Sequence, residues 1–237
     1  MKNILRYFNK KEWLLWGSSV LLILASFLMF DRGSYLTLTA SLIGVTSLIF
    51  NAKGNPIGQA LMIVFSILYG IISYSFSYYG EMITYLGMTA PMALFALISW
   101  LKNPFRGNRA EVAVNRIHRK EICFSLVLTV AVTVFFGWIL ALFHTENLIL
   151  STLSVATSFF AVYLTFRRSP YFALAYAAND IVLILLWILA RVQSPAYLSV
   201  TICFILFLVN DLYGFFSWRK MEKRQQSAVN DTSQKNV

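Results

Sequence analysis

Eight long, almost uncharged stretches divide this sequence, and they constrain its fold more than any other feature. A helix needs about 20 predominantly apolar residues to cross the hydrocarbon core of a bilayer, and each stretch is close to that length. Composition agrees, because 58% of the residues are hydrophobic and only 13% are charged, against about 25% charged in ordinary soluble domains. We therefore predict an all-α integral membrane protein whose eight transmembrane helices cover residues 13–30, 35–51, 56–79, 82–101, 121–143, 148–166, 170–190 and 196–217.

The first stretch follows basic residues and could be mistaken for a signal peptide. It is long, however, and its end, SFLMFDRG, has no clear small-x-small cleavage site. We predict that it is a helix of the protein.

The positions of lysine and arginine predict how these helices are oriented. If the N-terminus is cytoplasmic, all of the 20 basic residues except Arg32 and Arg191 fall on the cytoplasmic side. Membrane proteins concentrate Lys and Arg in their cytoplasmic loops, and one helix more or fewer would scramble this division. We expect both termini in the cytoplasm. The same placement accounts for the net charge of +10, so no nucleic-acid partner is expected.

A repeated unit organises the chain. The segments VTSLIFNAKGNP (45–56) and ATSFFAVYLTFRRSP (156–170) each end one helix and open the next at a proline. We predict a parallel 3+1+3 repeat plus one extra N-terminal helix, an arrangement that creates a substrate path between the repeats. The predicted units are a cytoplasmic N-terminus with the extra helix (1–34), repeat 1 (35–101), a basic cytoplasmic loop with the linking helix (102–147), repeat 2 (148–218) and a cytoplasmic tail (219–237), which we expect to be disordered after Arg224.

Polar residues inside the predicted helices mark the candidate substrate site. We identify two acidic residues there, Asp180 and Asp211, and ionisable groups in a membrane usually face a cavity or a partner. Residues three or four apart share a helix face, which brings further polar and aromatic side chains beside them. Such side chains suit a flat, polar ligand that is neutral or weakly cationic. The candidate substrate-binding residues are Asn179, Trp187, Asn210, Gln59, Tyr69, Asp180, Asp211, Tyr213 and Tyr176.

Several of these features also have a structural interpretation. Trp100 and Trp218 lie near the ends of predicted helices, where aromatic belts collect without any ligand, and Trp187 could belong to the external belt. Asp211 could instead pair with Arg219. These alternatives remain open at the level of the sequence.

The sequence offers little support for an enzyme. The two histidines, His118 and His144, fall in predicted loops on opposite sides of the membrane, and Cys123 and Cys203 lie in separate apolar stretches. Neither a Ser–His pair nor a metal site can be assembled from them, and no phosphate-binding loop motif is present. We predict no enzymatic activity, no catalytic residues, no metal and no cofactor.

The sequence resembles the PnuC family of bacterial vitamin transporters over residues 13–224. The resemblance rests on NDLYGFFSWRK (210–220), on Asn179-Asp180 and Trp187, and on the repeat plan with its basic termini. It implies a SWEET-like fold in the bacterial inner (plasma) membrane and passive uptake of nicotinamide riboside, an NAD precursor. It also implies a homotrimer and a cytoplasmic kinase that phosphorylates the substrate. Asn179, Trp187 and Asn210 match the family's polar and aromatic site, with Gln59 and Tyr69 opposite.

We therefore predict a carrier that moves a pyridine nucleoside by facilitated diffusion with alternating access. Three alternatives stay open. The first is a carrier of thiamine, a deoxynucleoside or another vitamin within the same family. The others are a proton-coupled carrier that uses Asp180 or Asp211, and a receptor-like vitamin-binding membrane subunit.

Overall fold

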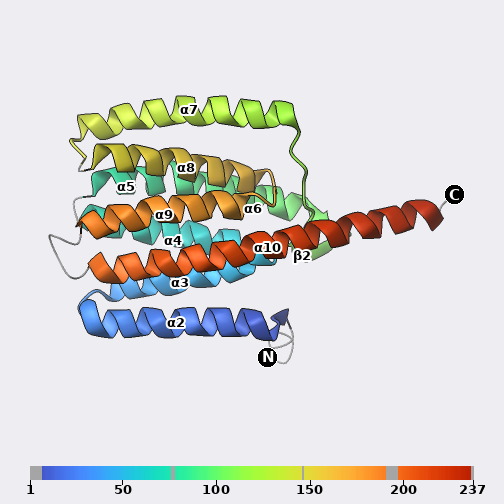
Figure 1. Ribbon diagram of the computed structural model, residues 1–237, viewed down its shortest axis with the longest axis horizontal. Helices are drawn as coiled ribbons and strands as arrows, with labels where there is room; N and C mark the ends of the chain where they lie inside the picture. Colours follow the sequence, from blue (N-terminus) through green and yellow to red (C-terminus); the bar gives the residue numbers. More distant parts are fainter. Residues whose placement is uncertain (1–6, 76–77, 146, 191–196, 236–237) are drawn as a thin grey trace.

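The structure is a computed structural model and describes residues 7–75, 78–145, 147–190 and 197–235. Within these residues, eight helical segments are long and apolar enough to cross a membrane, which confirms the predicted number (Figure 1). Residues 76–77 within the predicted helix 56–79, Arg191, and residue 196 at the start of the last predicted helix lie outside the described residues. The segments are α2 (Lys10–Phe30), α3 (Tyr35–Ala52), α4 (Pro56–Ser75), Tyr79–Lys102, α7 (Arg119–Leu142), α8 (Leu148–Phe166), α9 (Phe172–Ala190) and α10 (Tyr197–Lys235).

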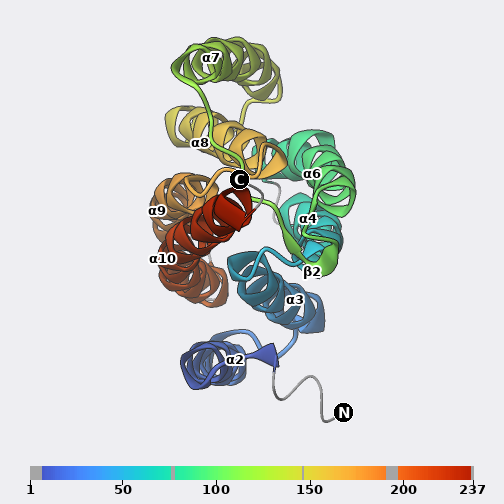
Figure 2. The ribbon, with the colours of Figure 1, turned by 90° about the vertical axis from the view of Figure 1, so that its right-hand side faces the viewer.

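Six of the segments surround the centre of the molecule, and two flank it. Viewed along the bundle, α3, α4, α6, α8, α9 and α10 form a ring, with α7 outside α8 and α2 outside α3 and α10 (Figure 2). In the most apolar window of each helix, 17% of the α2 residues and 6% of the α7 residues are buried. The corresponding shares are 33–56% in the other segments. The centre of the ring is therefore where a solute could be enclosed.

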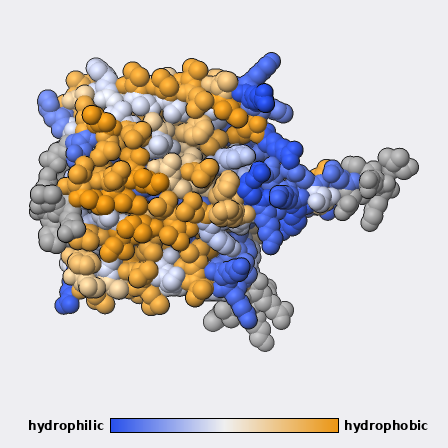
Figure 3. All heavy atoms as spheres, viewed as in Figure 1, coloured by the Kyte–Doolittle hydropathy of each residue, from blue (hydrophilic) through white to orange (hydrophobic). Residues whose placement is uncertain are grey.

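Polar and apolar surfaces separate along the bundle. The view in Figure 3 has an apolar band across the helices and a strongly hydrophilic region at the end that holds the hairpin and the extension of α10. We call this the basic end. The described N-terminal residues and the C-terminal part of α10 both lie there, as an even number of crossings requires (Figure 1).

The fourth crossing is irregular. It consists of α5 (Tyr79–Thr84), a π-helical turn (Tyr85–Thr89) and α6 (Ala90–Lys102). Pro91 has no N–H to offer the carbonyl of Gly87, and the wider turn just before it accommodates that lost bond. Single π-helical turns are frequent at functional sites, and this one faces the centre of the ring.

A β-hairpin occupies part of the segment that the sequence predicted as a loop. Strands β1 (Pro104–Phe105) and β2 (Asn108–Val112) pair antiparallel through the two-residue turn Arg106-Gly107. Both turn residues have positive φ, 49° and 78°, which is the geometry of a type I′ hairpin turn. The backbone N–H of Val112 then donates to the carbonyl of Gly54 over 2.9 Å, which fastens the hairpin to the turn between α3 and α4.

The expectation of a disordered tail after Arg224 is wrong, because α10 continues to Lys235. The hairpin supplies the tertiary contacts that the sequence did not reveal. Gln225 is buried, and its Nε2 donates to the carbonyl of Val112 over 3.0 Å while its Oε1 accepts from the N–H of Val114 over 2.8 Å. Neither Gly nor Pro occurs between Gly214 and Lys235 to end the helix.

The interpretation of Trp100 and Trp218 as belt residues is also wrong. Both are completely buried, at the basic end, in a cluster with Val112, Phe172 and Met221. Burial of an indole requires a partner for its N–H, and the last turn of a helix has carbonyls that can accept it. Trp100 Nε1 donates to the carbonyl of Thr165 over 2.9 Å, and Trp218 Nε1 donates to that of Asn51 over 2.7 Å.

Candidate functional site

A narrow internal cavity lies at the centre of the ring. Its polar wall comes from the last two helices, where Tyr176, Asn179 and Asp180 of α9 face Asp211 of α10. The cavity has a volume of about 20 Å³. A water molecule needs roughly 10–15 Å³ of such volume, so this space holds about one water. Side chains must therefore move before a nucleoside-sized ligand can enter.

The two carboxyl groups are the dominant chemical feature of the cavity. Asp180 is 3% exposed and Asp211 is 5% exposed, and both residues line the cavity. Two neighbouring carboxylates in a buried site repel each other, which favours a proton on one of them. The second oxygen of Asp180, Oδ2, is buried without a hydrogen-bond partner among the described residues. This oxygen is available to a donor or a cation that enters the cavity.

Asn179 is held by the neighbouring helix. Its Oδ1 accepts a hydrogen bond from Thr157 Oγ1 of α8 over 2.8 Å. This bond orients the amide so that Nδ2 is left to donate to a ligand. Asn179 is therefore a donor adjacent to the carboxyl pair.

Most of the other residues that line the cavity are aromatic. Phe65 of α4 and Phe207 of α10 lie with their rings 5.3 Å apart, and Tyr85 of the π-helical turn packs against Phe65 at 6.0 Å. Thr89 and Ser158 add two hydroxyl groups to the lining. Rings and hydroxyls beside a carboxyl pair suit a ligand with a flat cationic ring and several hydroxyl groups.

Trp187 lies outside this cavity, in the aromatic cluster next to it. Its Nε1 donates to the hydroxyl oxygen of Tyr69 over 2.6 Å, and its ring lies 5.0 Å from Tyr78 and 5.5 Å from Tyr197. Tyr69 in turn packs against Tyr85 of the cavity wall, with ring centroids 4.4 Å apart. The structure thus brings Trp187 and Tyr69 together and connects them to the cavity through Tyr85.

Three candidate residues lie elsewhere. Gln59 Nε2 donates to Asn51 Oδ1 over 2.9 Å, near the basic end of α4. Asn210 faces α2, where its Nδ2 donates to Ser19 Oγ over 3.1 Å. Tyr213 also faces α2, and its hydroxyl donates to Glu12 Oε1 over 3.2 Å. None of the three lines the cavity that the described residues form, so a direct role for them in binding stays a prediction.

One buried acid within the helical bundle was not predicted from the sequence. Glu81 of α5 is 1% exposed and lies beside Ser154 of α8, within electrostatic range of Tyr69 and Tyr85. It precedes the predicted fourth helix (82–101) by one residue, so the sequence places it in a loop. The regular apolar pattern that starts at residue 82 gave no sign that the helix begins earlier. Glu12 near the start of α2 is likewise buried, and it forms an ion pair with Lys53 at 3.1 Å.

The part of the chain that the structure describes offers no candidate metal site. No group of three or more His, Cys, Asp or Glu side chains converges there.

Comparison with known proteins identifies the family of this chain. The sequence profile of the family described as nicotinamide mononucleotide transporter matches residues 34–220. The chain belongs to this family. The match spans the predicted repeats and the linking helix, and it includes every residue of the cavity. The family consists of membrane transporters, so the chain is a transport protein and not an enzyme.

Individual relatives agree with this assignment. The nicotinamide riboside transporter PnuC of Neisseria mucosa is 27% identical over 218 residues, which cover 88% of this chain and 81% of the relative. The protein of the same name from Haemophilus influenzae is 23% identical over 192 residues, covering 81% and 82%. A crystal structure of the vitamin B3 transporter PnuC, 22% identical, superimposes with a TM-score of 0.81 over 92% of this chain and 94% of that one. The last comparison shows that the fold is shared.

Proposed function

We propose that this protein takes up nicotinamide riboside, a vitamin B3 nucleoside, by facilitated diffusion. The observation that carries the proposal is the central cavity, which Asp180 and Asp211 line together with aromatic side chains. Nicotinamide riboside combines a flat pyridinium cation, an amide and ribose hydroxyls. A carboxylate and aromatic faces attract the cation, while Asn179 and the hydroxyl groups bond the amide and the ribose.

Charge distinguishes this substrate from the mononucleotide in the family's name. Nicotinamide mononucleotide carries an additional phosphate, which proteins bind with Arg, Lys or backbone N–H groups. The residues described around the cavity include two acids and neither Lys nor Arg. A phosphate there would meet like charge in a site of low dielectric constant, so we favour the riboside.

Alternating access between two parallel repeats is the proposed mechanism. Two equivalent helix ends support the 3+1+3 plan with α2 as the extra helix. The N–H of Asn55 donates to the carbonyl of Phe50, and the N–H of Ser169 donates to the carbonyl of Leu164, each over 3.0 Å. Donor and acceptor of the second bond each lie 114 residues after those of the first. The residues before them, Gly54 and Arg168, have positive φ of 66° and 58°. Rocking of these similar units would open the cavity to either side.

A proton-coupled carrier is the second candidate, because the buried carboxyl groups of Asp180 and Asp211 both line the cavity and could exchange a proton there. An imposed pH gradient distinguishes the two. In facilitated diffusion, substrate equilibrates across a liposome membrane and the gradient drives no accumulation. Accumulation that collapses with an ionophore and is lost in Asp180→Asn would establish proton coupling instead.

For the cellular setting, we propose the bacterial inner membrane with both termini in the cytoplasm. The distribution of basic residues supports this orientation, since the basic end carries the loops rich in Lys and Arg. The family resemblance further leads us to propose a homotrimer and a cytoplasmic kinase that draws uptake inward by phosphorylating the substrate. The mass of the purified protein by light scattering tests the trimer.

Uptake into liposomes that contain only this purified chain tests the proposed function. Labelled nicotinamide riboside should enter and be displaced by excess unlabelled riboside. Nicotinamide mononucleotide and neutral nicotinamide should compete poorly, because the first adds a phosphate and the second lacks the cation. Thiamine and a deoxynucleoside serve as the family alternatives, and stronger competition by either would reassign the substrate.

A further inference from the structure

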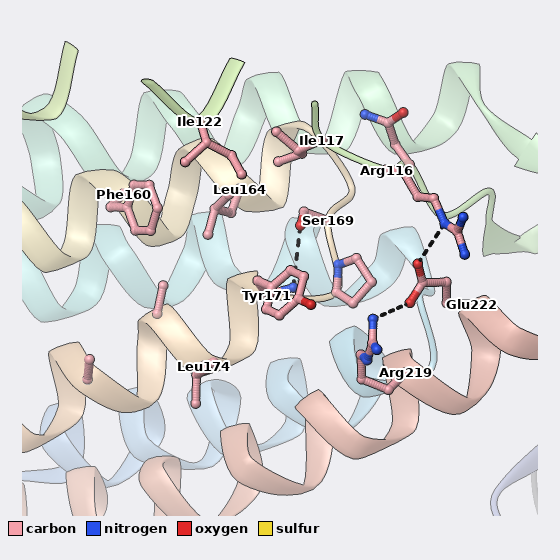
Figure 4. A pocket seen from close by; sticks show the side chains of 14 residues that line it. Arg116, Ile117, Ile122, Phe160, Leu164, Ser169, Tyr171, Leu174, Arg219 and Glu222 are labelled. Atoms are coloured by element: carbon pink, nitrogen blue, oxygen red, sulfur yellow. Dashed lines mark hydrogen bonds and ion pairs between the residues drawn. The ribbon is translucent and has the colours of Figure 1, made fainter. Parts of the chain in front are cut away.

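A second, much larger hollow lies at the basic end, outside the ring. It has a volume of about 740 Å³, within the roughly 300–1,000 Å³ range of small-molecule sites. The hollow is formed by α8, α9, α10, the start of α7 and the segment 113–118 that precedes it (Figure 4). It shares no lining residue with the central cavity among the residues described. We call it the basic-end groove.

The inner part of the groove is apolar and open to the outer surface of the bundle. Ile122 of α7, Phe160 and Leu164 of α8 and Leu174 of α9 form its walls (Figure 4). Ile122 and Leu174 are 40% and 45% exposed, so the groove continues into the apolar surface of the crossing helices. An acyl chain from the surrounding bilayer can reach it directly.

The outer part of the groove carries more positive than negative charge. Arg116 Nε and Arg219 Nη1 contact the two carboxylate oxygens of Glu222, at 3.2 and 2.6 Å (Figure 4). One carboxylate neutralises only one of the two guanidinium groups. Arg219 also lies 5.5 Å from the ring centre of Tyr171, which positions it at the mouth of the groove. Both arginines keep unused N–H donors that a phosphate can accept.

We propose that the basic-end groove binds one anionic phospholipid, such as phosphatidylglycerol. Its phosphate would lie between Arg116 and Arg219, and one acyl chain would follow Ile122, Phe160 and Leu174. Basic pockets between transmembrane helices on the cytoplasmic side are suited to anionic headgroups. The lipid would connect α8, α9 and α10 at the basic end, where the two buried tryptophans also lie. The shape of the groove favours a lipid over the transported solute, because the groove opens outward and not toward Asp180.

Lipid binding can be measured by native mass spectrometry of the purified protein in a neutral detergent. Phosphatidylglycerol and phosphatidylcholine with identical acyl chains are titrated separately. The test variant is Arg116→Gln with Arg219→Gln, and its matched control is Arg109→Gln with Lys220→Gln, which removes two charges at the same end outside the groove. A second test, Ala178→Phe, fills the groove, and Leu185→Phe adds the same ring on an exposed part of α9 outside it. Each variant must first be monodisperse.

The expected results depend on the charge of the lipid and on whether the substitution lies in the groove. Phosphatidylglycerol should bind more tightly than phosphatidylcholine. Its dissociation constant should rise about thirtyfold in the Arg116/Arg219 variant, and Ala178→Phe should weaken both lipids. The two controls should bind like the unmodified protein. Equal affinity for the two lipids, or equal loss in the Arg109/Lys220 control, overturns the proposal. So does a change of oligomeric mass in Ala178→Phe, because the groove would then be covered by a second copy of the chain.

Discussion

The rings of Trp100 and Trp218 lie 5.4 Å apart, and each indole bonds the last turn of a helix from the other half of the chain. Trp100 in the last turn of α6 reaches Thr165 in α8, while Trp218 in α10 reaches Asn51 in α3. The two bonds are therefore reciprocal. They join the proposed repeats at the basic end, below the central cavity, and they leave the opposite end free of this connection among the described residues.

Replacing either tryptophan by phenylalanine should destabilise the protein without weakening substrate binding. Trp100→Phe or Trp218→Phe keeps a ring in the cluster but removes the N–H, and the loss should reduce the free energy of unfolding by about 1–3 kcal/mol. Thermal unfolding in detergent measures the effect. Trp138→Phe is the matched control, because Trp138 is 62% exposed on α7. If Trp100→Phe unfolds at the same temperature as this control, the reciprocal bonds do not hold the halves together.

Asp180→Asn should weaken binding of the cationic substrate selectively. The amide has the size of the carboxyl group but no charge, so the pyridinium ring loses its counter-ion. A hydrogen bond or contact to a charged group contributes about 1.5–3 kcal/mol, which corresponds to a roughly ten- to hundredfold higher dissociation constant. Calorimetric titration with nicotinamide riboside measures it, and Asp31→Asn, in the connection between α2 and α3, is the control. Unchanged affinity in Asp180→Asn would falsify the proposed role of the carboxyl pair.

Asn179 and Asn210 form a matched pair for separating a binding role from a packing role. Both are buried asparagines directly before an aspartate, but only Asn179 lines the cavity, whereas Asn210 bonds Ser19 of α2. Asn179→Ala should raise the dissociation constant about tenfold with little change in unfolding temperature. Asn210→Ala should lower the unfolding temperature and leave binding nearly unchanged. An equal loss of affinity in both variants would mean that the ligand also reaches the face of α10 that contacts α2.

Arg168 and Gly54 occupy equivalent positions with positive φ, and substitutions at the two positions should change stability in opposite directions. A non-glycine residue in this conformation costs roughly 1–2 kcal/mol, and burial also lowers the pKa of the Arg168 guanidinium because it penalises the charged form. Arg168→Gly should therefore raise the unfolding temperature. Gly54→Ala should lower it, since a Cβ there would lie 3.0 Å from Met221 and 3.3 Å from Val112. The same shift in both variants would contradict this account.

Cysteine labelling tests the orientation. In a background with Cys123→Ser and Cys203→Ala, Gly33→Cys places a thiol between α2 and α3, and Ala110→Cys places one in β2 at the basic end. An impermeant reagent should label position 33 in intact cells and position 110 only after permeabilisation. The reverse pattern would invert the protein in the membrane.

The helices could be predicted because their signals are local. An apolar stretch of about 20 residues can cross a bilayer whatever surrounds it. The orientation follows from the number of Lys and Arg residues in each loop, which requires no tertiary contact. The hairpin and the extension of α10 could not be found in this way. They depend on each other, through Gln225 and Val112, and neither segment has a strong hydrophobic pattern of its own.

The burial of the two tryptophans could not be predicted from the sequence for a different reason. Trp100 and Trp218 stand near the ends of apolar stretches in the sequence, where a belt at the membrane surface and a buried core produce the same pattern. Only the position of Thr165 and Asn51, far away in the chain, decides that both indoles turn inward.

The sequence by itself determined the membrane class, the eight crossings and the presence of polar groups at mid-helix, because each follows from the composition of one segment. Tertiary structure alone decided which polar groups share a cavity. Asn179-Asp180 and Asn210-Asp211 are the same dipeptide on neighbouring helices, yet Asn179 meets the cavity and Asn210 meets α2. The physical reason is that a helix presents every face to some neighbour, and the neighbour is set by packing of the whole bundle.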